Sequence, residues 1–187
     1  LYWLEHFHID GFRCDMAGGQ TEAFWSETIQ ALRDHSPEIF MLAESNFPQM
    51  HDVCFDATYG WEFHHLINEV ARGDKGTDEL HQYILRDADK FPKDSYRLLF
   101  IDNHDENSWN GTVASRLGNN AHAAYVLCAT LPNAIPLIYS GQEVGLNHSL
   151  RFFERDTIDW SLDSQADFYG LMNQLNSTLP ALANGAN

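Results

Sequence analysis

The stretch Ile9-Asp10-Gly11-Phe12-Arg13-Cys14-Asp15 decides how this chain of 187 residues folds. Its apolar and aromatic residues, bounded by polar ones, predict a strand from Phe7 to Asp15. A helical pattern follows from Thr21 to Arg33, with Thr21 as a good N-cap, and a short buried strand follows from Ile39 to Ala43. Strand, helix and strand in this order predict one βαβ unit with parallel strands.

The same alternation continues along the rest of the chain. We expect a weaker strand at Val53–Ala57, paired surface helices at Trp61–Arg72 and Asp78–Ala88, a strand at Arg97–Asp102, a helix at Asn120–Thr130, a strand at Pro136–Ser140 and a helix at Asp167–Leu179. Repeated βα units favour an α/β fold, either a doubly wound sheet or a (β/α)8 barrel. A whole barrel needs about 250 residues, so a barrel of this length would lack roughly three strands.

Composition excludes several classes of function. Eleven Lys and Arg against 27 Asp and Glu give a net charge of 11 − 27 = −16, which repels nucleic acid and anionic membrane surfaces. The longest apolar stretch, Ala123–Leu131, is too short to cross a membrane. Three cysteines, Cys14, Cys54 and Cys128, form no C-x-x-C pair, and we expect all three to be buried thiols.

The first two predicted strands each end in a carboxylate. Arg13 and Asp15 share one face of their strand, so the guanidinium favours an ionised Asp15, as a nucleophile or a charge stabiliser needs. Alternatively, Asp15 is a helix cap or an ion-pair partner. Ile39–Ala43 delivers Glu44 from an apolar run, and apolar surroundings would let it act as a general acid. Pairing of Glu44 with a nearby Arg is the alternative.

The strand at Arg97–Asp102 also ends in a polar cluster, Asp102-Asn103-His104-Asp105. His104 with Asp102 or Asp105 could ligate a metal, but no H-x-x-x-H or H-E-x-x-H element supports a metal site. Carboxylates at three strand ends suggest glycoside hydrolysis, which needs an acid and a nucleophile or base around one bond. Aromatic residues that could stack on sugars, or simply pack, follow the strands at Tyr59, Trp61 and Trp109.

Four segments, in order, resemble those of the α-amylase family of glycoside hydrolases. They are Gly11-Phe12-Arg13-Cys14-Asp15, Leu42-Ala43-Glu44, Phe100-Ile101-Asp102-Asn103-His104-Asp105 and Ile135-Pro136-Leu137-Ile138-Tyr139-Ser140-Gly141-Gln142-Glu143, similar to the family's segments at the fourth, fifth, seventh and eighth barrel strands. The resemblance implies a partial (β/α)8 TIM barrel of about five parallel strands, spanning residues 1–187 as the C-terminal portion of the catalytic barrel. It also implies that the family's inserted domain and C-terminal β-sandwich lie outside the chain.

The resemblance also implies roles for individual residues. Asp15 becomes the nucleophile, Glu44 the general acid/base and Asp105 the transition-state stabiliser, while Arg13, His104 and Asn103 bind substrate. Many α-amylases carry Lys-His three and four residues beyond the nucleophile, near a calcium ion, whereas Gly18-Gly19 stand here. No cofactor is therefore assigned, and calcium (Ca) is left as an option for the whole protein only.

The function implied by the resemblance is hydrolysis of α-1,4-glucosidic bonds in starch, maltodextrins or related α-glucans, with retention of configuration. An α-glucosidase or transglucosylase of the same family, acting on α-1,6 links or disaccharides, is one alternative. A non-catalytic carbohydrate-binding relative is another, although Asp15, Glu44 and Asp105 are all kept. The expected partner is an α-glucan or oligosaccharide, with no nucleic acid and no membrane; oligomeric state and cell compartment are not assigned.

Overall fold

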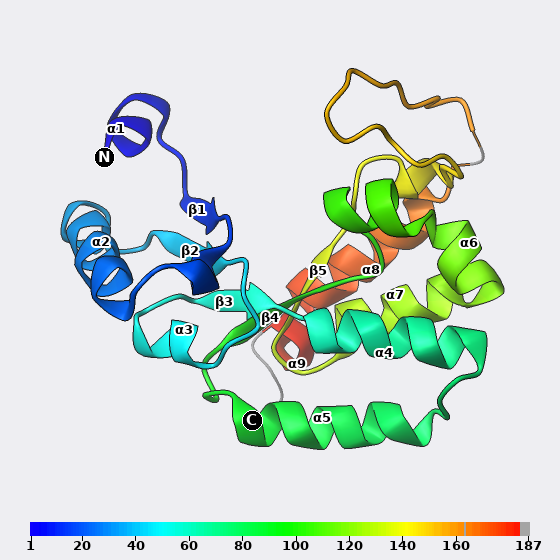
Figure 1. Cartoon of the computed structure of the whole chain (residues 1–187), viewed down its shortest axis with the longest axis horizontal. Coiled ribbons are helices and arrows are strands. Elements are labelled where there is room, and N and C mark those ends of the chain that lie inside the picture. The colour runs from blue at the N-terminus through cyan, green and yellow to red at the C-terminus, as the bar shows by residue number, and fades with distance from the viewer. Residues whose placement is uncertain (163, 184–187) are drawn as a thin grey trace. The chain divides into compact units, whose positions relative to one another are not determined.

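The computed structural model describes residues 1–162 and 164–183 (Figure 1). Five strands are hydrogen-bonded into one sheet in the order β1-β2-β3-β4-β5, and the strands run parallel. The strands are β1 (Gly11–Cys14), β2 (Phe40–Ala43), β3 (Ala57–Tyr59), β4 (Tyr96–Phe100) and β5 (Ala134–Leu137). Strand order thus equals chain order, as in a (β/α)8 barrel and unlike a doubly wound sheet, the two folds that the βα repeat left open.

Helices occupy the connections between the strands. The α-helices are α1 (Tyr2–Phe7), α2 (Glu22–His35), α3 (Gln49–Asp52), α4 (Trp61–Arg72), α5 (Asp78–Lys90), α6 (Val113–Leu117), α7 (Ala121–Thr130), α8 (Ala166–Thr178) and α9 (Pro180–Ala183). Single turns of 3-10 helix are η1 (Ala17–Gly19), η3 (Gly118–Asn120) and η4 (Gln142–Val144), and η2 (Glu106–Asn110) is a π-helix. Among the described residues, no helix is both long enough and apolar enough to cross a membrane.

The chain divides into two compact units, which we describe separately. The first comprises Leu1–Gly60 and Arg86–Arg97, and the second comprises Trp61–Leu85 and the described residues from Leu98 onward. In the first unit, α2 lies beside β1 and β2 (Figure 1), and its Trp25 and Ile29 are buried in one cluster with Met41 of β2. The Thr21 hydroxyl accepts a hydrogen bond from the Phe24 N–H, which confirms the predicted cap of α2.

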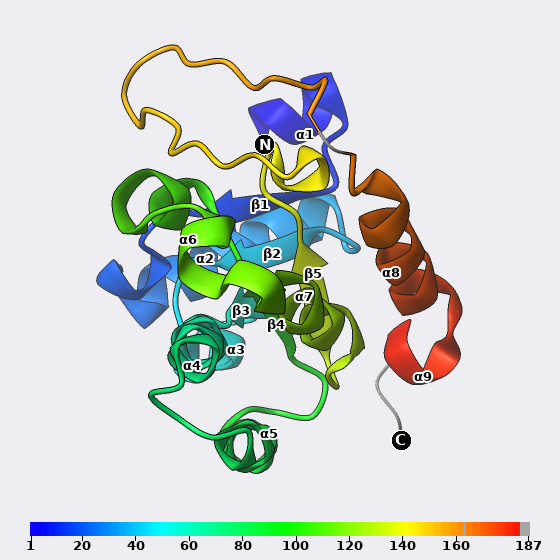
Figure 2. The same cartoon turned by 90° about the vertical axis from the view of Figure 1, so that its right-hand side faces the viewer.

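The second unit has its own core. Phe63, Leu99 and Tyr125 are almost inaccessible to solvent and belong to one cluster that joins α4, β4 and α7. Figure 2 shows α7 beside β5, and α7 also packs against α8. One face of α4 is buried in this cluster, and Glu62 and His65 on its other face are exposed, so α4 is a surface helix as predicted.

Several local predictions need correction. The first strand is shorter than Phe7–Asp15, because α1 includes Phe7 and a left-handed His8 ends that helix. The third strand begins at Ala57, since Cys54 adopts a positive φ of 72° in the turn after α3. Exposure of the Cys54 thiol in that turn contradicts its predicted burial; Cys14 is half-buried, and only Cys128 is fully buried.

Candidate active site

In the first unit, β1 brings Arg13 and Asp15 together. Asp15 follows the last residue of β1, and the Arg13 Nη1 atom lies 2.6 Å from the Asp15 Oδ1 atom. The contact confirms the pairing predicted from the two-residue period of a strand. The Asp15 side chain is 77% exposed, so its second carboxylate oxygen is open to a substrate.

Glu44 joins the same guanidinium from β2. Cys14 pairs with Ala43 in the register of β1 and β2, so Asp15 and Glu44 both follow the last pair of that ladder. The Arg13 Nη2 atom lies 2.6 Å from Glu44 Oε1, and the Met16 N–H donates to Glu44 Oε2 at 2.7 Å. Both Glu44 oxygens therefore contact hydrogen-bond donors, and the alternative, a Glu paired with Arg, describes this geometry.

Arg13 itself is held by the neighbouring strand β3. Its Nε atom donates to the Tyr59 hydroxyl at 3.1 Å, and the guanidinium carbon lies 5.6 Å from the centre of the Tyr59 ring. Burial alone lowers the pKa of Arg13, but the hydrogen bonds to Tyr59 and Asp15 and the nearby Glu44 raise it overall. Tyr59 is buried, so it orients Arg13 and has no open face for a sugar.

In the second unit, Asn103, His104 and Asp105 follow β4. The Asn103 side chain is buried, and its Oδ1 atom accepts hydrogen bonds from the Asp105 N–H at 3.0 Å and the Glu106 N–H at 2.8 Å. These bonds stabilise the turn that leads into η2 and fix the position of the Asp105 backbone. The Asn103 Nδ2 atom is buried without a hydrogen-bond partner.

His104 and Asp105 are the accessible members of this turn. Their side chains are 43% and 35% exposed, and His104 Nε2 lies 3.6 Å from Asp105 Oδ2. The second unit thus brings together Asn103, His104 and Asp105, and the first brings together Arg13, Asp15 and Glu44. Each group stands directly after the carboxyl end of a parallel strand, where the active sites of α/β enzymes are built.

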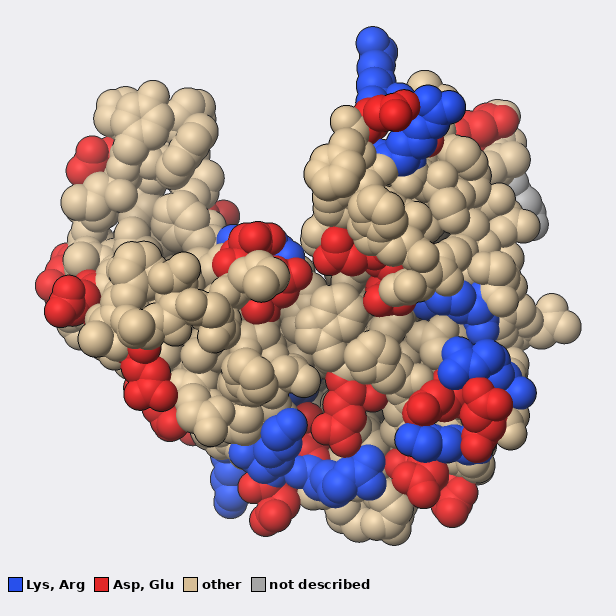
Figure 3. All heavy atoms as spheres, in the orientation of Figure 1, with Lys and Arg blue, Asp and Glu red and all other residues tan. Residues whose placement is uncertain are grey.

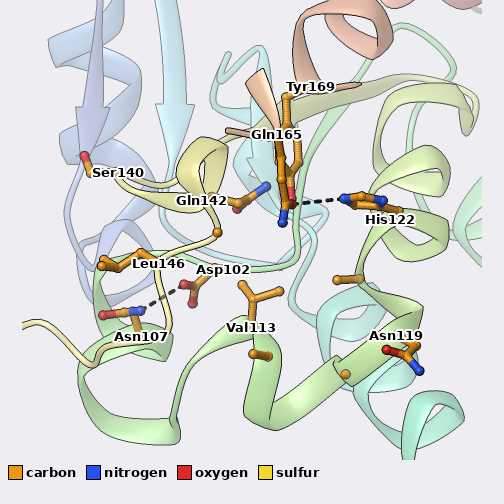
Figure 4. A pocket seen from close by; sticks show the side chains of 14 residues that line it. Asp102, Asn107, Val113, Asn119, His122, Ser140, Gln142, Leu146, Gln165 and Tyr169 are labelled. Carbon is orange, nitrogen blue, oxygen red and sulfur yellow. Dashed lines mark hydrogen bonds between the residues drawn. The ribbon is translucent and has the colours of Figure 1, made fainter. Parts of the chain in front are cut away.

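Asp102 belongs to a different environment from its neighbours. It is buried, its Oδ1 atom lies 2.7 Å from Arg116 Nη2, and its Oδ2 atom accepts a hydrogen bond from Asn107. Burial raises the pKa of Asp102 to about 6, against the lowering effects of Arg116 and Asn107. Asp102 lines a cavity of about 290 Å³, into which Gln142 and the hydrogen-bonded pair His122 and Gln165 also project (Figure 4).

A second polar network of this unit has no local signal in the sequence. His64 of α4 is buried, and its Nε2 atom lies 3.0 Å from Glu106 Oε2, immediately after Asp105. The two residues are far apart in the chain, so no motif spacing could pair them. Within residues 1–162 and 164–183, no three His, Cys, Asp or Glu residues gather closely enough to hold a metal ion.

Comparison with known proteins decides the family. The family model described as "Alpha amylase, catalytic domain" matches residues 1–171. The chain belongs to the alpha-amylase family. It is 28% identical over 202 aligned residues to alpha-amylase 2 of Dictyoglomus thermophilum, covering 98% of this chain and 35% of that protein. It is 25% identical to the intracellular maltogenic amylase of Bacillus subtilis, covering 88% of this chain and 29% of that protein.

A solved structure gives the architecture. The crystal structure of an alpha-amylase from Lactobacillus plantarum superposes with a TM-score of 0.81 at 26% identity, covering 100% of this chain and 47% of the other. The five-stranded sheet with its helices is therefore part of a (β/α)8 barrel, as the resemblance implied. The chain spans about a third of the length of the curated relatives it matches.

Proposed function

We propose that the whole protein is a retaining glycoside hydrolase that cleaves α-1,4-glucosidic bonds of starch, maltodextrins or related α-glucans. The observation that carries the proposal is the Arg13 guanidinium, whose two terminal nitrogens lie 2.6 Å from Asp15 and 2.6 Å from Glu44. Membership of the alpha-amylase family and relatives named alpha-amylase and maltogenic amylase support the choice of an α-glucan substrate.

The shared guanidinium bears on the stereochemistry. Retaining glycosidases hold their two carboxyl groups about 5 to 5.5 Å apart, whereas inverting enzymes leave about 6.5 to 9.5 Å for a water molecule. Two carboxylates that contact neighbouring nitrogens of one guanidinium are compatible with the shorter class. In this proposal, Asp15 is therefore a nucleophile and not the base that activates water from the opposite face.

The proposed reaction has two steps. The Glu44 carboxyl group donates its proton to the leaving glycosidic oxygen while an Asp15 oxygen bonds to the anomeric carbon, giving a glycosyl ester. Glu44, now a carboxylate, takes a proton from water, whose oxygen displaces Asp15 and restores both residues. Arg13 contacts Glu44 Oε1 and the Met16 N–H contacts Oε2, so a second lone pair of either oxygen can hold the transferred proton.

Arg13 and the turn after β4 have supporting roles in this reaction. Arg13 orients the Asp15 oxygen and is itself fixed by Tyr59. Asp105 and His104 are partly exposed polar groups after β4 and would accept and donate hydrogen bonds to sugar hydroxyls, with Asp105 stabilising the charged transition state. Asn103 holds the backbone of Asp105 and would act on substrate through it.

The direct test of the reaction is product release from maltoheptaose, compared between this chain and a version extended upstream in the same protein. Retention predicts that the first product has the α configuration, which proton NMR detects before mutarotation. A β product would reject the retaining mechanism. Absence of cleavage in both forms would reject the proposed substrate.

Asp15 can be identified as the nucleophile by covalent labelling. An activated fluoro-glucoside slows hydrolysis of the glycosyl ester, so peptide mapping by mass spectrometry should find the label on Asp15 in the active form. Asp15→Asn should abolish labelling, while Asp10→Asn, at an exposed carboxylate just before β1, should leave it unchanged. A label on a different carboxylate would overturn the assignment.

A further inference from the structure

Three exposed aromatic side chains gather in the second unit. Trp109 is 61% exposed, Phe152 39% and Phe153 85%. The Phe152 ring centre lies 5.4 Å from that of Trp109 and 4.7 Å from that of Phe153. Leaving this much aromatic surface in water is unfavourable, and clustered exposed apolar groups mark binding surfaces more often than isolated ones do. We call Trp109, Phe152 and Phe153 the aromatic platform.

Hydrogen bonds connect the two chain segments that carry the platform. Trp109 lies in η2, and Phe152 follows Leu150 in the long loop after β5. The Ser108 hydroxyl donates to the Leu150 carbonyl at 2.7 Å, and the Leu150 N–H donates to Asn107 Oδ1 at 2.8 Å. The rings are therefore held together by hydrogen bonds between their two segments as well as by their own contacts.

The loop is also braced from within. Asp156 accepts hydrogen bonds from the Thr157 N–H at 2.8 Å, the Arg151 N–H at 3.1 Å and His148 Nε2 at 3.0 Å. The Thr157 and Arg151 backbone bonds, followed by the bond from His148, lower the pKa of Asp156 to about 2. A surface fixed before its ligand arrives loses less conformational entropy on binding, so this bracing favours a recognition role.

The platform is continuous with the candidate site. The His104 ring stacks on Phe152 with centres 5.9 Å apart and planes 29° apart, and His104 contacts Asp105. Aromatic faces and hydrogen-bonding groups therefore adjoin on one surface. A pyranose has the same combination, with C–H groups on its ring faces and hydroxyls around its edge, and the electron-rich face of an aromatic ring attracts such C–H groups.

We propose that the aromatic platform of Trp109, Phe152 and Phe153 is a sugar-binding subsite that stacks on a glucosyl residue of an α-glucan chain, beside the residue bound by His104 and Asp105. The choice of glucan rests on the proposed function. The nearby polar groups favour a hydroxylated ligand over an apolar protein partner. A second copy of the chain on this surface is an outcome that the test below distinguishes.

The test is binding of maltoheptaose to the full chain, followed by calorimetry and by tryptophan fluorescence. Trp109→Ala and Phe153→Ala should each weaken binding roughly 3- to 10-fold, the range of a single aromatic contact. Trp160→Ala is the matched control, because Trp160 is 59% exposed and belongs to the same unit. Its removal should leave the affinity unchanged.

A conservative variant separates stacking from folding. Trp109→Phe keeps an aromatic face, so it should bind maltoheptaose within about 3-fold of wild type but lose most of the fluorescence change that the sugar causes. The proposal is overturned by wild-type affinity in both alanine variants, by a full fluorescence response in Trp109→Phe, or by failure of the wild type to bind at tens of millimolar. It is also overturned if Trp109→Ala changes only the sedimenting mass, which would indicate a contact between copies.

The same variants keep this proposal separate from the proposed function. Weaker binding in the platform variants, together with no hydrolysis by the upstream-extended protein, would uphold the subsite and reject the catalytic assignment. Hydrolysis by the upstream-extended protein, together with unchanged binding in the platform variants, would uphold the catalytic assignment and reject the subsite.

Discussion

Glu44 is the residue whose side-chain chemistry the proposed reaction uses twice. Glu44→Gln keeps the shape but cannot transfer a proton, so we expect kcat on maltooligosaccharides to fall about 10²- to 10⁴-fold in the upstream-extended protein. Glu38→Gln, an exposed site just before β2, is the matched control and should keep full activity. Steady-state kinetics and circular dichroism measure turnover and folding, and near-normal turnover would remove Glu44 from the acid role.

Asp102 makes a prediction about stability and pH. Burial raises its pKa to about 6 in the folded chain from 3.8, so the folded state holds this proton more tightly than the unfolded state. The resulting stabilisation is complete below about pH 4 and is lost as pH rises through 6, at most about 3 kcal/mol from a shift of roughly two pKa units. The lowered pKa of Glu106 acts in the opposite direction, because its contribution is lost as pH falls.

Comparing wild type with Asp102→Asn isolates the Asp102 contribution. The free energy of unfolding in urea, measured at several values between pH 4 and 7, should decline with pH more steeply in wild type than in the variant. Because Arg116 and Asn107 are untouched in both proteins, the difference between the two curves reports Asp102 itself. Parallel curves would mean that Asp102 has an ordinary pKa.

At the scale of elements, Gly11 shows how closely β1 and β2 approach. Gly11 pairs with Phe40, and a Cβ atom added at Gly11 would collide with the Phe40 carbonyl oxygen. Gly11→Ala should therefore lower the free energy of unfolding by about 1 to 3 kcal/mol, measured by denaturant titration. Gly19→Ala is the control, since a Cβ there meets open space, and its effect should stay within about 0.5 kcal/mol. Equal losses would show that the clash is relieved cheaply.

Elements with strong local signals could be predicted from the sequence. α4 has the predicted bounds Trp61–Arg72 because its apolar residues recur at helical spacing, and the Thr21 cap is a local contact. β3 lies later in the chain than the predicted strand Val53–Ala57, because residues distant in sequence fix its position. The Asp56 carboxylate accepts a hydrogen bond from the Met41 N–H of β2 and also contacts Arg33 of α2. No window of sequence contains those partners.

In the candidate site too, contacts between residues close in sequence could be predicted, and contacts between distant residues could not. Arg13 and Asp15 are two residues apart on one strand, so their pairing follows from strand geometry, which the sequence alone supplies. Glu44 reaches Arg13 only through the register of β1 and β2, and an apolar run does not show that a charged partner arrives from a neighbouring strand. The exposure of Trp109 and its contacts with Phe152 likewise depend on a loop far along the chain.

At the scale of the whole molecule, net charge opposes association between copies of the chain, and the edges of the sheet favour it. The net charge of −16 makes copies of the chain repel. On the face in Figure 3, basic side chains lie beside acidic ones and do not form a separate basic patch. β1 and β5 are the end strands of the sheet, with backbone groups available for pairing with another chain. The range of this repulsion is the electrostatic screening length, which shortens as the ionic strength rises.

Salt should therefore promote association of the isolated chain. Raising ionic strength from about 0.01 M to 1 M shortens the screening length from roughly 30 Å to 3 Å, so sedimentation velocity should show a larger mass at high salt. Pro136 has no N–H to donate, which weakens β5 as a template and leaves β1 as the better pairing edge. Hydrogen exchange should then slow in Gly11–Cys14 at high salt but not in Ala134–Leu137. Protection of β5 instead would show that Pro136 does not block its edge. An unchanged mass would show that charge repulsion does not limit association of the chain.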